Sequence, residues 1–327
     1  MGLFDFIFGK KEAAPKEYEE PAERNAEPDQ ELMPEQEYYQ EDTTNERRSA
    51  ADNINYLEDA EVALGVVMPL AFAKHWDKIK KTKLSYVAIE ATESDTLSLT
   101  QSKFGHYPYL PAGYDYPKDS EGRYMYPLAQ INFSDVPPLA GYPTSGYLQF
   151  YISGFDDAYG LDFSDPRSQK DSRVIYFEAD AIKEHIQDFS FLDEVMNLDS
   201  NPVYKPHALQ FSAGDEFVGL SDVRYELQLN EFNVDDVVES YPHIARELED
   251  YVWRNFQGSG HKIGGYATFT QEDPRGGNDL EDYILLLQID TDDHIMWGDS
   301  GVANFFIHPD DLAKKDFSKV MYNWDCC

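Results

Sequence analysis

Cysteine, long apolar runs and basic side chains are all scarce in this chain of 327 residues. The only two cysteines, Cys326 and Cys327, are adjacent, so they cannot provide the separated pairs of a disulfide framework. This favours a reducing compartment, and we expect a cytoplasmic protein. No apolar stretch reaches the length of a membrane span, and the first residues lack the pattern of a secretory signal peptide. Membrane contact is expected at most as a weak one by the apolar segment Met1–Lys11.

Positive charge is the next deficit. Lys and Arg number 27 against 62 Asp and Glu, which gives a formal net charge of −35. A surface this negative repels nucleic-acid phosphates and anionic lipids, so neither is expected as a partner. Charge instead predicts a basic protein partner, although solubility alone would explain the same composition. The sequence does not predict an oligomeric state.

Motifs for cofactor chemistry and catalysis are also missing. There is no glycine-rich phosphate loop with its lysine and no Cys/His metal spacing, so no cofactor is expected. The segment Trp297–Gly301 looks like a serine nucleophile segment, but no spacing ties a histidine to Ser300, and a tight turn is the favoured interpretation. The nearby acidic cluster lacks the glycine and glutamate of a calcium loop, which favours a solvated hairpin. A non-enzymatic role is therefore favoured.

Repeated blocks are the most informative feature that is present. Five short blocks recur in the same order in the second part of the chain: Lys103–Tyr107 as Lys262–Tyr266, Gln130–Asn132 as Gln288–Asp290, Phe150–Ile152 as Phe305–Ile307, Asp156–Phe163 as Asp310–Phe317, and Arg173–Tyr176 as Lys319–Tyr322. The order predicts a tandem duplication. Aromatic residues make up 14% of the chain, which favours a β-rich fold because their rings pack well on pleated surfaces.

The composition divides the chain into three parts. Residues 1–53 read as a disordered acidic extension with a short apolar start, because their Glu, Pro and Gln content leaves little apolar area to bury. Residues 54–200 and 201–327 read as the two repeats, each a helical preface (56–83, then 235–256) followed by short strands. The predicted fold class is α+β and β-dominated, an internal duplication of two helix-then-strands halves packed as a pseudo-twofold pair in one compact unit. The strands are expected at 126–133, 146–152, 173–178, 283–290, 302–307 and 319–322, with further strands at 84–89 and 96–99 and a helix within 179–201.

Residues 60–327 resemble the YwqG-like family of bacterial proteins, whose function is not established. The resemblance rests on long ordered motifs, among them Ser102–Gly105, Leu128–Phe133, His261–Tyr266, Trp297–Gly301 and Asn323–Cys326. It implies a soluble intracellular protein, sometimes encoded beside toxin and immunity genes. The chain departs from the family in its acidic extension and at Ala267, a position after Gly-Gly-Tyr where the family often has a proline.

Two hypotheses about function follow. The first is a non-enzymatic acidic binding module, immunity- or stress-related, that steers and masks a basic partner. The alternative is a small-molecule-binding protein or hydrolase that uses a cleft between the two halves. The candidate ligand-binding residues are the two strand glutamines, the Lys-x-Gly-Gly element and several residues without counterparts in the first repeat: Gln130, Lys262, Gly264, Gly265, Gln271, Asp273, Arg275, Gln288, Trp297 and Asp299. For the glutamines a purely structural role, in which each ties down a neighbouring loop backbone, is favoured over ligand binding.

Overall fold

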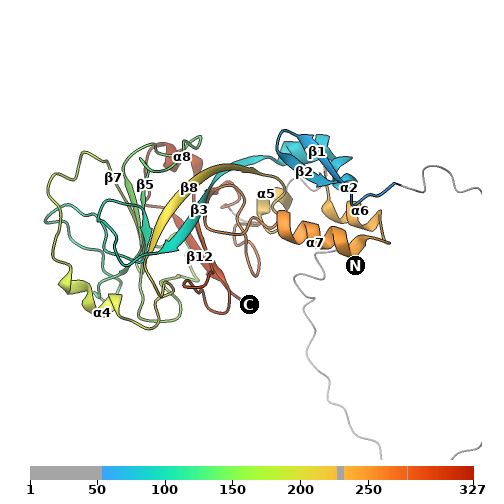
Figure 1. The fold of residues 1–327 in the computed structure, drawn as a ribbon. Helices are drawn as coiled ribbons and strands as arrows, with labels where there is room; N and C mark the ends of the chain where they lie inside the picture. Colours follow the sequence, from blue (N-terminus) through green and yellow to red (C-terminus); the bar gives the residue numbers. More distant parts are fainter. Residues whose placement is uncertain (1–53, 227–231, 278) are drawn as a thin grey trace, which may run out of the picture.

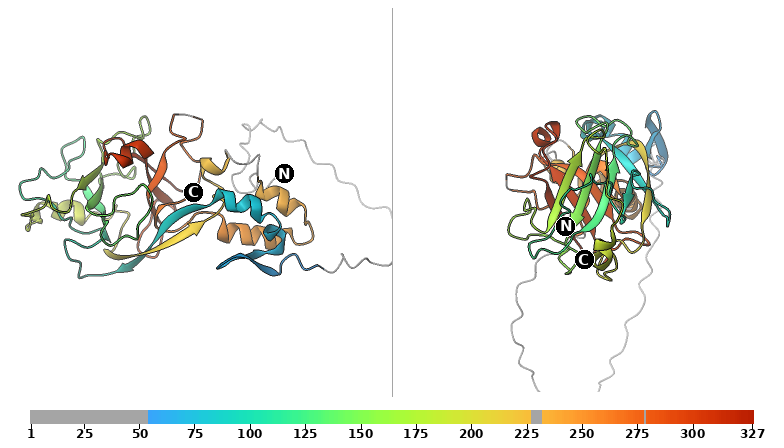
Figure 2. Two further views of the ribbon diagram at one scale, coloured as in Figure 1. Left: turned by 90° about the horizontal axis from the view of Figure 1, so that it is seen from above. Right: turned by 90° about the vertical axis from the view of Figure 1, so that its left-hand side faces the viewer.

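A single sheet of ten antiparallel strands dominates the fold of the computed structural model (Figure 1). The structure describes residues 54–226, 232–277 and 279–327, so the expectations for Met1–Lys11 and for the acidic extension lie outside the described residues. The strand order is β12-β11-β10-β9-β3-β8-β4-β5-β6-β7. The sheet curls into a nearly closed barrel, which Figure 2 shows from two further sides.

The longest strands, β3 and β8, pair over ten residues each at the middle of this order. One flank of four strands continues from β8 and the other continues from β3. The strand bounds are β3 Leu84–Glu93, β4 Lys103–Phe104, β5 Tyr126–Asn132, β6 Tyr147–Ile152, β7 Ser172–Phe177, β8 His207–Glu216, β9 Lys262–Gly264, β10 Ile284–Asp290, β11 Val302–Ile307 and β12 Met321–Asp325.

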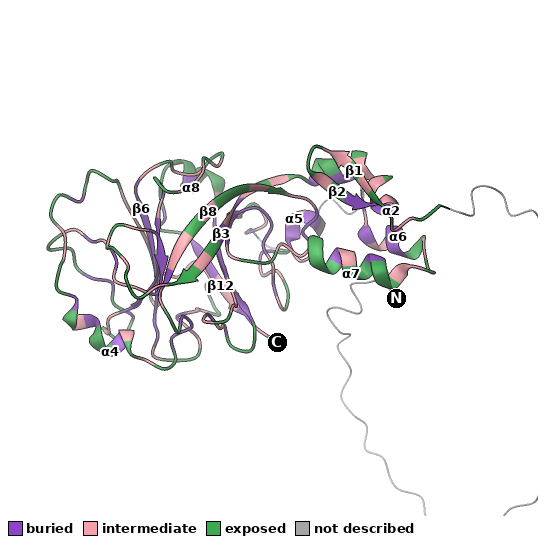
Figure 3. Ribbon diagram, in the orientation of Figure 1, coloured by how far each residue is buried: buried purple, intermediate pink, exposed green. Residues whose placement is uncertain are grey.

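The strands inside the flanks are buried along nearly their whole length (Figure 3). The β6 sequence YLQFYI and the β11 sequence VANFFI are buried at every position, because both faces of these strands are covered. Rings from the two flanks meet inside the barrel, where Phe150 lies 4.8 Å from Phe305 between ring centroids. One continuous apolar core therefore joins the flanks.

A small lobe lies at one end of the β3–β8 ribbon, outside the barrel (Figures 1 and 2). Of the described residues, 54–83, 217–226 and 232–256 form it, and it has its own apolar core. Helix α7 presents Leu248 and Val252, one turn apart, to this core. The lobe contains β1 Asp59–Ala63, β2 Val66–Pro69, α2 Leu70–Ala73, α3 Trp76–Ile79, η2 Lys80–Thr82, α5 Val223–Glu226, α6 Val234–Glu239 and α7 Ala245–Asn255.

The predicted fold class is wrong. The chain does not form two α+β halves, each with its own helical preface, packed as a pseudo-twofold pair; it forms one β-dominated barrel-like sheet, and the internal duplication is not supported. Residues 56–83 begin as the β1–β2 hairpin, because β-branched Val62 and Val66 favour strands and Gly65 turns the chain at φ +74°. Both expected prefaces pack together in the lobe, where Phe72 lies 5.5 Å from Tyr251 between ring centroids.

Most of the predicted strands are confirmed. The six flank strands β5, β6, β7, β10, β11 and β12 lie at the expected positions, within two residues at their starts. The helical preface expected at 235–256 is confirmed as the two helices α6 and α7. Residues 96–99 form no strand, and residues 179–201 contain only the short helices η3 Ser190–Leu192 and α4 Asp193–Met196. A short helix α8, Pro309–Ala313, follows β11, and none of the helices in the described ranges is long and apolar enough to cross a membrane.

Candidate functional site

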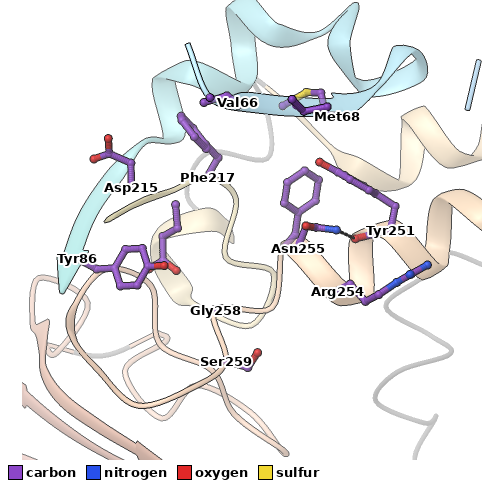
Figure 4. A pocket seen from close by; sticks show the side chains of 14 residues that line it. Val66, Met68, Tyr86, Asp215, Phe217, Tyr251, Arg254, Asn255, Gly258 and Ser259 are labelled. Carbon is purple, nitrogen blue, oxygen red and sulfur yellow. Dashed lines mark hydrogen bonds between the residues drawn. The ribbon is translucent and has the colours of Figure 1, made fainter. Parts of the chain in front are cut away.

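A pocket of about 360 Å³ lies where the lobe meets the barrel (Figure 4). We call it the junction pocket. Its walls come from the β1–β2 hairpin, from the lobe ends of β3 and β8, and from the end of α7 with the turn that follows it. The lining residues are Gly65, Val66, Val67, Met68, Tyr86, Asp215, Glu216, Phe217, Tyr251, Arg254, Asn255, Phe256, Gly258 and Ser259.

A buried ion pair lies beside the junction pocket. Lys262 of β9 is 1% exposed, and its Nζ lies 2.9 Å and 3.1 Å from the two carboxylate oxygens of Glu216. The backbone amide of Tyr266 donates to the same carboxylate. Burial lowers the pKa of Lys262, and the Glu216 carboxylate opposes this change by favouring the ammonium form. The pair therefore links β9 to a wall of the pocket.

Gly264 and Gly265 shape the backbone next to this ion pair. Both have positive φ, at +71° and +74°, which a glycine adopts without the penalty of a side chain. A Cβ atom on Gly265 would collide with the Glu216 carboxylate and would lie 2.9 Å from the Cβ of Tyr86. The two glycines therefore let the chain pass close to the Lys262–Glu216 pair.

The charged residues beyond Lys262 form a buried network. Asp222, fully buried, accepts from Arg224 at 2.6 Å and lies 2.9 Å from Arg275. Arg275, also fully buried, makes a second ion pair with Asp273 at 2.5 Å. Burial alone would raise the pKa of Asp222, but the two guanidinium groups hold it well below its usual range. Arg275 and Asp273 thus connect the segment after β9 to the lobe and are internally paired.

The two strand glutamines hold loop backbones. The Gln288 amide donates to the carbonyl oxygens of Gly258 and Gly260, at 2.9 Å and 2.8 Å, and accepts from the Thr268 amide. Gln130 makes the same kind of contacts in the other flank, to Leu99, Gln101 and Tyr109. Gln288 consequently fixes the turn at Gly258 that forms one wall of the junction pocket.

None of the ten sequence candidates lines the junction pocket. Gln271 donates to the Cys326 carbonyl oxygen at 2.8 Å. Trp297 is fully buried, and its indole Nε1 makes no hydrogen bond within the described part of the chain. Asp299 is exposed in the turn before β11. In the described ranges no group of three or more His, Cys, Asp or Glu side chains could hold a metal ion, including the acidic cluster around Asp292, and both cysteines are free thiols.

None of the residues that line the junction pocket was predicted from the sequence. Tyr86, Asp215 and Glu216 lie on the β3–β8 ribbon, whose pairing joins residues that are 114 to 132 positions apart in the sequence. In the sequence, Arg254 is an ordinary basic residue in the last turn of a helix, where its positive charge interacts favourably with the helix dipole. No local pattern marks these residues, because only the fold brings them together.

Comparison with known families matches residues 102–326 to a domain of unknown function, DUF1963. The chain belongs to the DUF1963 family. No curated protein matches it. The family match includes Asp215, Glu216, Arg254 and Lys262, whereas the β1–β2 hairpin and Tyr86 precede it. The junction pocket is thus built partly from the family domain and partly from the segment that comes before it.

Proposed function

We propose that this DUF1963 protein is a non-enzymatic binding protein whose junction pocket holds a small zwitterionic ligand, such as a free amino acid. The observation that carries the proposal is the placement of residues of opposite charge on opposite walls of the pocket, Asp215 at the end of β8 and Arg254 at the end of α7 (Figure 4). Such an arrangement matches a ligand that carries both an ammonium and a carboxylate group. Resemblance to the YwqG-like family and a cytoplasmic location are compatible with this role and belong to the same proposal.

Arg254 supplies the anion-binding side. Its Nε donates to the Asp250 carbonyl oxygen one helical turn earlier, and its guanidinium makes no ion pair with any residue that the structure describes. The side chain is exposed at the pocket wall. A guanidinium with free donors binds a carboxylate in a two-pronged geometry. Arg254 is therefore the residue expected to hold the ligand carboxylate.

The opposite wall supplies acceptors for an ammonium group. Asp215 lies 2.7 Å from Lys83 Nζ and accepts from Ser85 at 2.8 Å, which fixes its carboxylate. Glu216 beside it is fixed by Lys262. Each carboxylate oxygen can accept more than one hydrogen bond, so both groups can still receive a ligand donor. Tyr86, Phe217 and Tyr251 provide aromatic surface between the two charged sides.

The test is a binding measurement with the common amino acids as probes. We expect at least one of them to raise the melting temperature of the full chain and to bind in titration calorimetry. Arg254→Met should weaken that binding at least about tenfold, since a hydrogen bond to a charged group contributes about 1.5–3 kcal/mol. Arg246→Met is the matched control, because Arg246 is exposed on the same helix and does not line the pocket. If no amino acid binds, or if Arg254→Met binds as tightly as the unmodified chain, the proposal is wrong.

The acidic surface supports a second candidate, the masking of a basic protein partner. Residues 51–327 carry 48 acidic and 21 basic side chains, so most carboxylates in this part have no basic residue to match them. Electrostatic steering would then speed association with a basic partner and weaken as salt is added. Amino-acid binding that is independent of salt, with no salt-sensitive protein partner, favours the junction pocket over this candidate.

A further inference from the structure

Two surface pockets adjoin each other at β7. β7 lies on the side of the barrel away from the lobe (Figure 1). Their volumes are about 560 Å³ and 540 Å³, and both are lined by Tyr114 and Arg173. Because they share these two residues, they form one groove, which we call the β7 groove. β7 is the terminal strand of the sheet, so the groove lies at an edge that no further strand covers within the described ranges.

The charge of the β7 groove differs from that of the protein as a whole. Arg173 donates from Nε to the Gln169 carbonyl oxygen at 2.9 Å and has no ion pair with a described residue. Lys118 lies with its Nζ 4.7 Å from the centre of the Tyr124 ring and likewise makes no ion pair in the described ranges. The lining residue Asp115 is exposed and acidic. Two cations without a carboxylate partner are unexpected in a chain with a net charge of −35.

The other end of the groove is neutral. Lys315 lies 2.6 Å from the Glu178 carboxylate and 3.1 Å from the Tyr176 hydroxyl, so its charge is matched. Gln169 fixes the backbone there by accepting from the Val174 amide and donating to the Phe317 carbonyl oxygen. These contacts hold β7 in place and leave Arg173, at the meeting point of the two pockets, as the main site for an anion.

Aromatic rings form the wall beside Arg173. Tyr116 and Tyr124 each pack against Phe191, with ring centroids 5.3 Å and 5.0 Å apart. Tyr114 packs edge-on against Phe177 at 5.2 Å and is 37% exposed, so one side of its ring is open to a ligand. A set of rings fixed by their mutual contacts offers a flat apolar surface to another ring.

We infer that the β7 groove binds a small aromatic anion, with its ring against Tyr114 and the Phe191 cluster and its anionic group on Arg173. A guanidinium forms paired hydrogen bonds with a carboxylate or a phosphate, and Lys118 adds a second positive charge at the rim. Neither an aromatic alcohol nor a bare anion satisfies both parts of the groove. This site is separate from the junction pocket, with which it shares no lining residue.

Binding of phenyl phosphate tests the inference. Inorganic phosphate and phenol serve as probes of its anionic part and its aromatic part. We expect phenyl phosphate to bind the full chain at least about tenfold more tightly than either of the others, a difference of about 1.4 kcal/mol. Arg173→Met should weaken its binding at least about tenfold, and Tyr114→Ala should also weaken it. Arg167→Met is the matched control, because Arg167 lies near in sequence but pairs with Asp279 and lines neither pocket.

Each outcome decides the matter. Absence of phenyl phosphate binding overturns the inference, as does equal binding by the Arg173→Met protein. If inorganic phosphate binds as tightly as phenyl phosphate, the aromatic part of the inference is wrong. Thermal unfolding of each variant shows whether it is folded. If Arg173→Met does not fold, the binding of phenyl phosphate to Tyr114→Ala, which changes only a partly exposed ring, provides the second test. Binding of amino acids at the junction pocket should be unchanged in both variants, so the two proposals can fail separately.

Discussion

The two flanks of the sheet each bury a lysine opposite a glutamine, but the ammonium groups of the two lysines have different hydrogen-bond partners. Lys103 of β4 pairs in register with Gln130, and Lys262 of β9 pairs with Gln288. Both lysines are 1% exposed. The Nζ of Lys103 donates to three backbone carbonyl oxygens, of Ser98, Leu99 and Tyr107, at 2.6–3.0 Å. Lys262 instead donates to a carboxylate, Glu216.

Because of this difference, only Lys262 is connected to the junction pocket. The carbonyl oxygens around Lys103 belong to loops that the lysine itself fixes, and neither Lys103 nor these partners line the junction pocket. Glu216 belongs to the ribbon that joins the barrel to the lobe, and it lines the junction pocket. A similar strand position therefore fixes a loop in one flank, whereas in the other it connects the sheet to the candidate site.

Removing Lys262 should give the largest effect. Lys262→Met leaves the Glu216 carboxylate without its counter-ion, and breaking a buried pair from one side costs about 3–5 kcal/mol. We expect a loss of this size in the free energy of unfolding, measured by urea denaturation. The double variant Lys262→Met with Glu216→Gln should recover part of the loss, because no unpaired charge remains. Equal stability of the single and double variants would show that the unpaired Glu216 charge costs nothing. The ion pair would then not distinguish the environment of Lys262 from that of Lys103.

The pH dependence of the free energy of unfolding should distinguish Lys103 from Lys262, with an effect somewhat smaller than that of removing Lys262. Burial lowers the pKa of Lys103 to about 7, whereas an unfolded lysine keeps its proton to about pH 10.4. Between these values the unfolded chain binds more protons, so the stability of the protein should rise with pH, by up to about 1.4 kcal/mol per pH unit. The measurement is the free energy of unfolding at pH 7, 8 and 9, compared with that of Lys103→Met.

The Lys103→Met variant should lack this rise, since methionine does not titrate. A difference between the two proteins that stays constant from pH 7 to 9 would contradict the prediction. It would mean that the three carbonyl oxygens keep the ammonium charged throughout this range, because hydrogen bonds to the charged form favour it. The two lysines would then differ only in their partners.

The contrast also shows what the sequence could predict. The flank strands β5 and β10 were found because their apolar runs are continuous and bounded by turn residues. Strand β8 was missed because its sequence HALQFSAGDE is rich in small and polar residues and is largely half-buried or exposed. The pairing of Glu216 with Lys262 and the contact between the two helical segments of the lobe are long-range results of the fold. For this reason the lysine was predicted as a candidate, and its partner and its pocket were not.

The smallest effect concerns the polar groups beside the two glutamines. In one flank Gln149, opposite Gln130, accepts from the buried Tyr151 hydroxyl at 2.6 Å. In the other flank Asn304 lies opposite Gln288, and two residues later stands Phe306, which has no hydroxyl. The Asn304 Oδ1 atom is buried without a hydrogen-bond partner among the described residues. Polar contacts are therefore complete beside Gln130 and incomplete beside Gln288.

Tyr151→Phe should make the first flank resemble the second, because it leaves the Gln149 oxygen without its donor. We expect a loss of about 1–2 kcal/mol in the free energy of unfolding, the usual cost of a buried acceptor left unsatisfied. Tyr322→Phe in β12 is the matched control: its hydroxyl is buried but has no partner in the described chain, so its removal should cost nothing or stabilise slightly. Equal losses in the two variants would show that the hydroxyls contribute through packing, and that the more complete polar contacts beside Gln130 add no stability of their own.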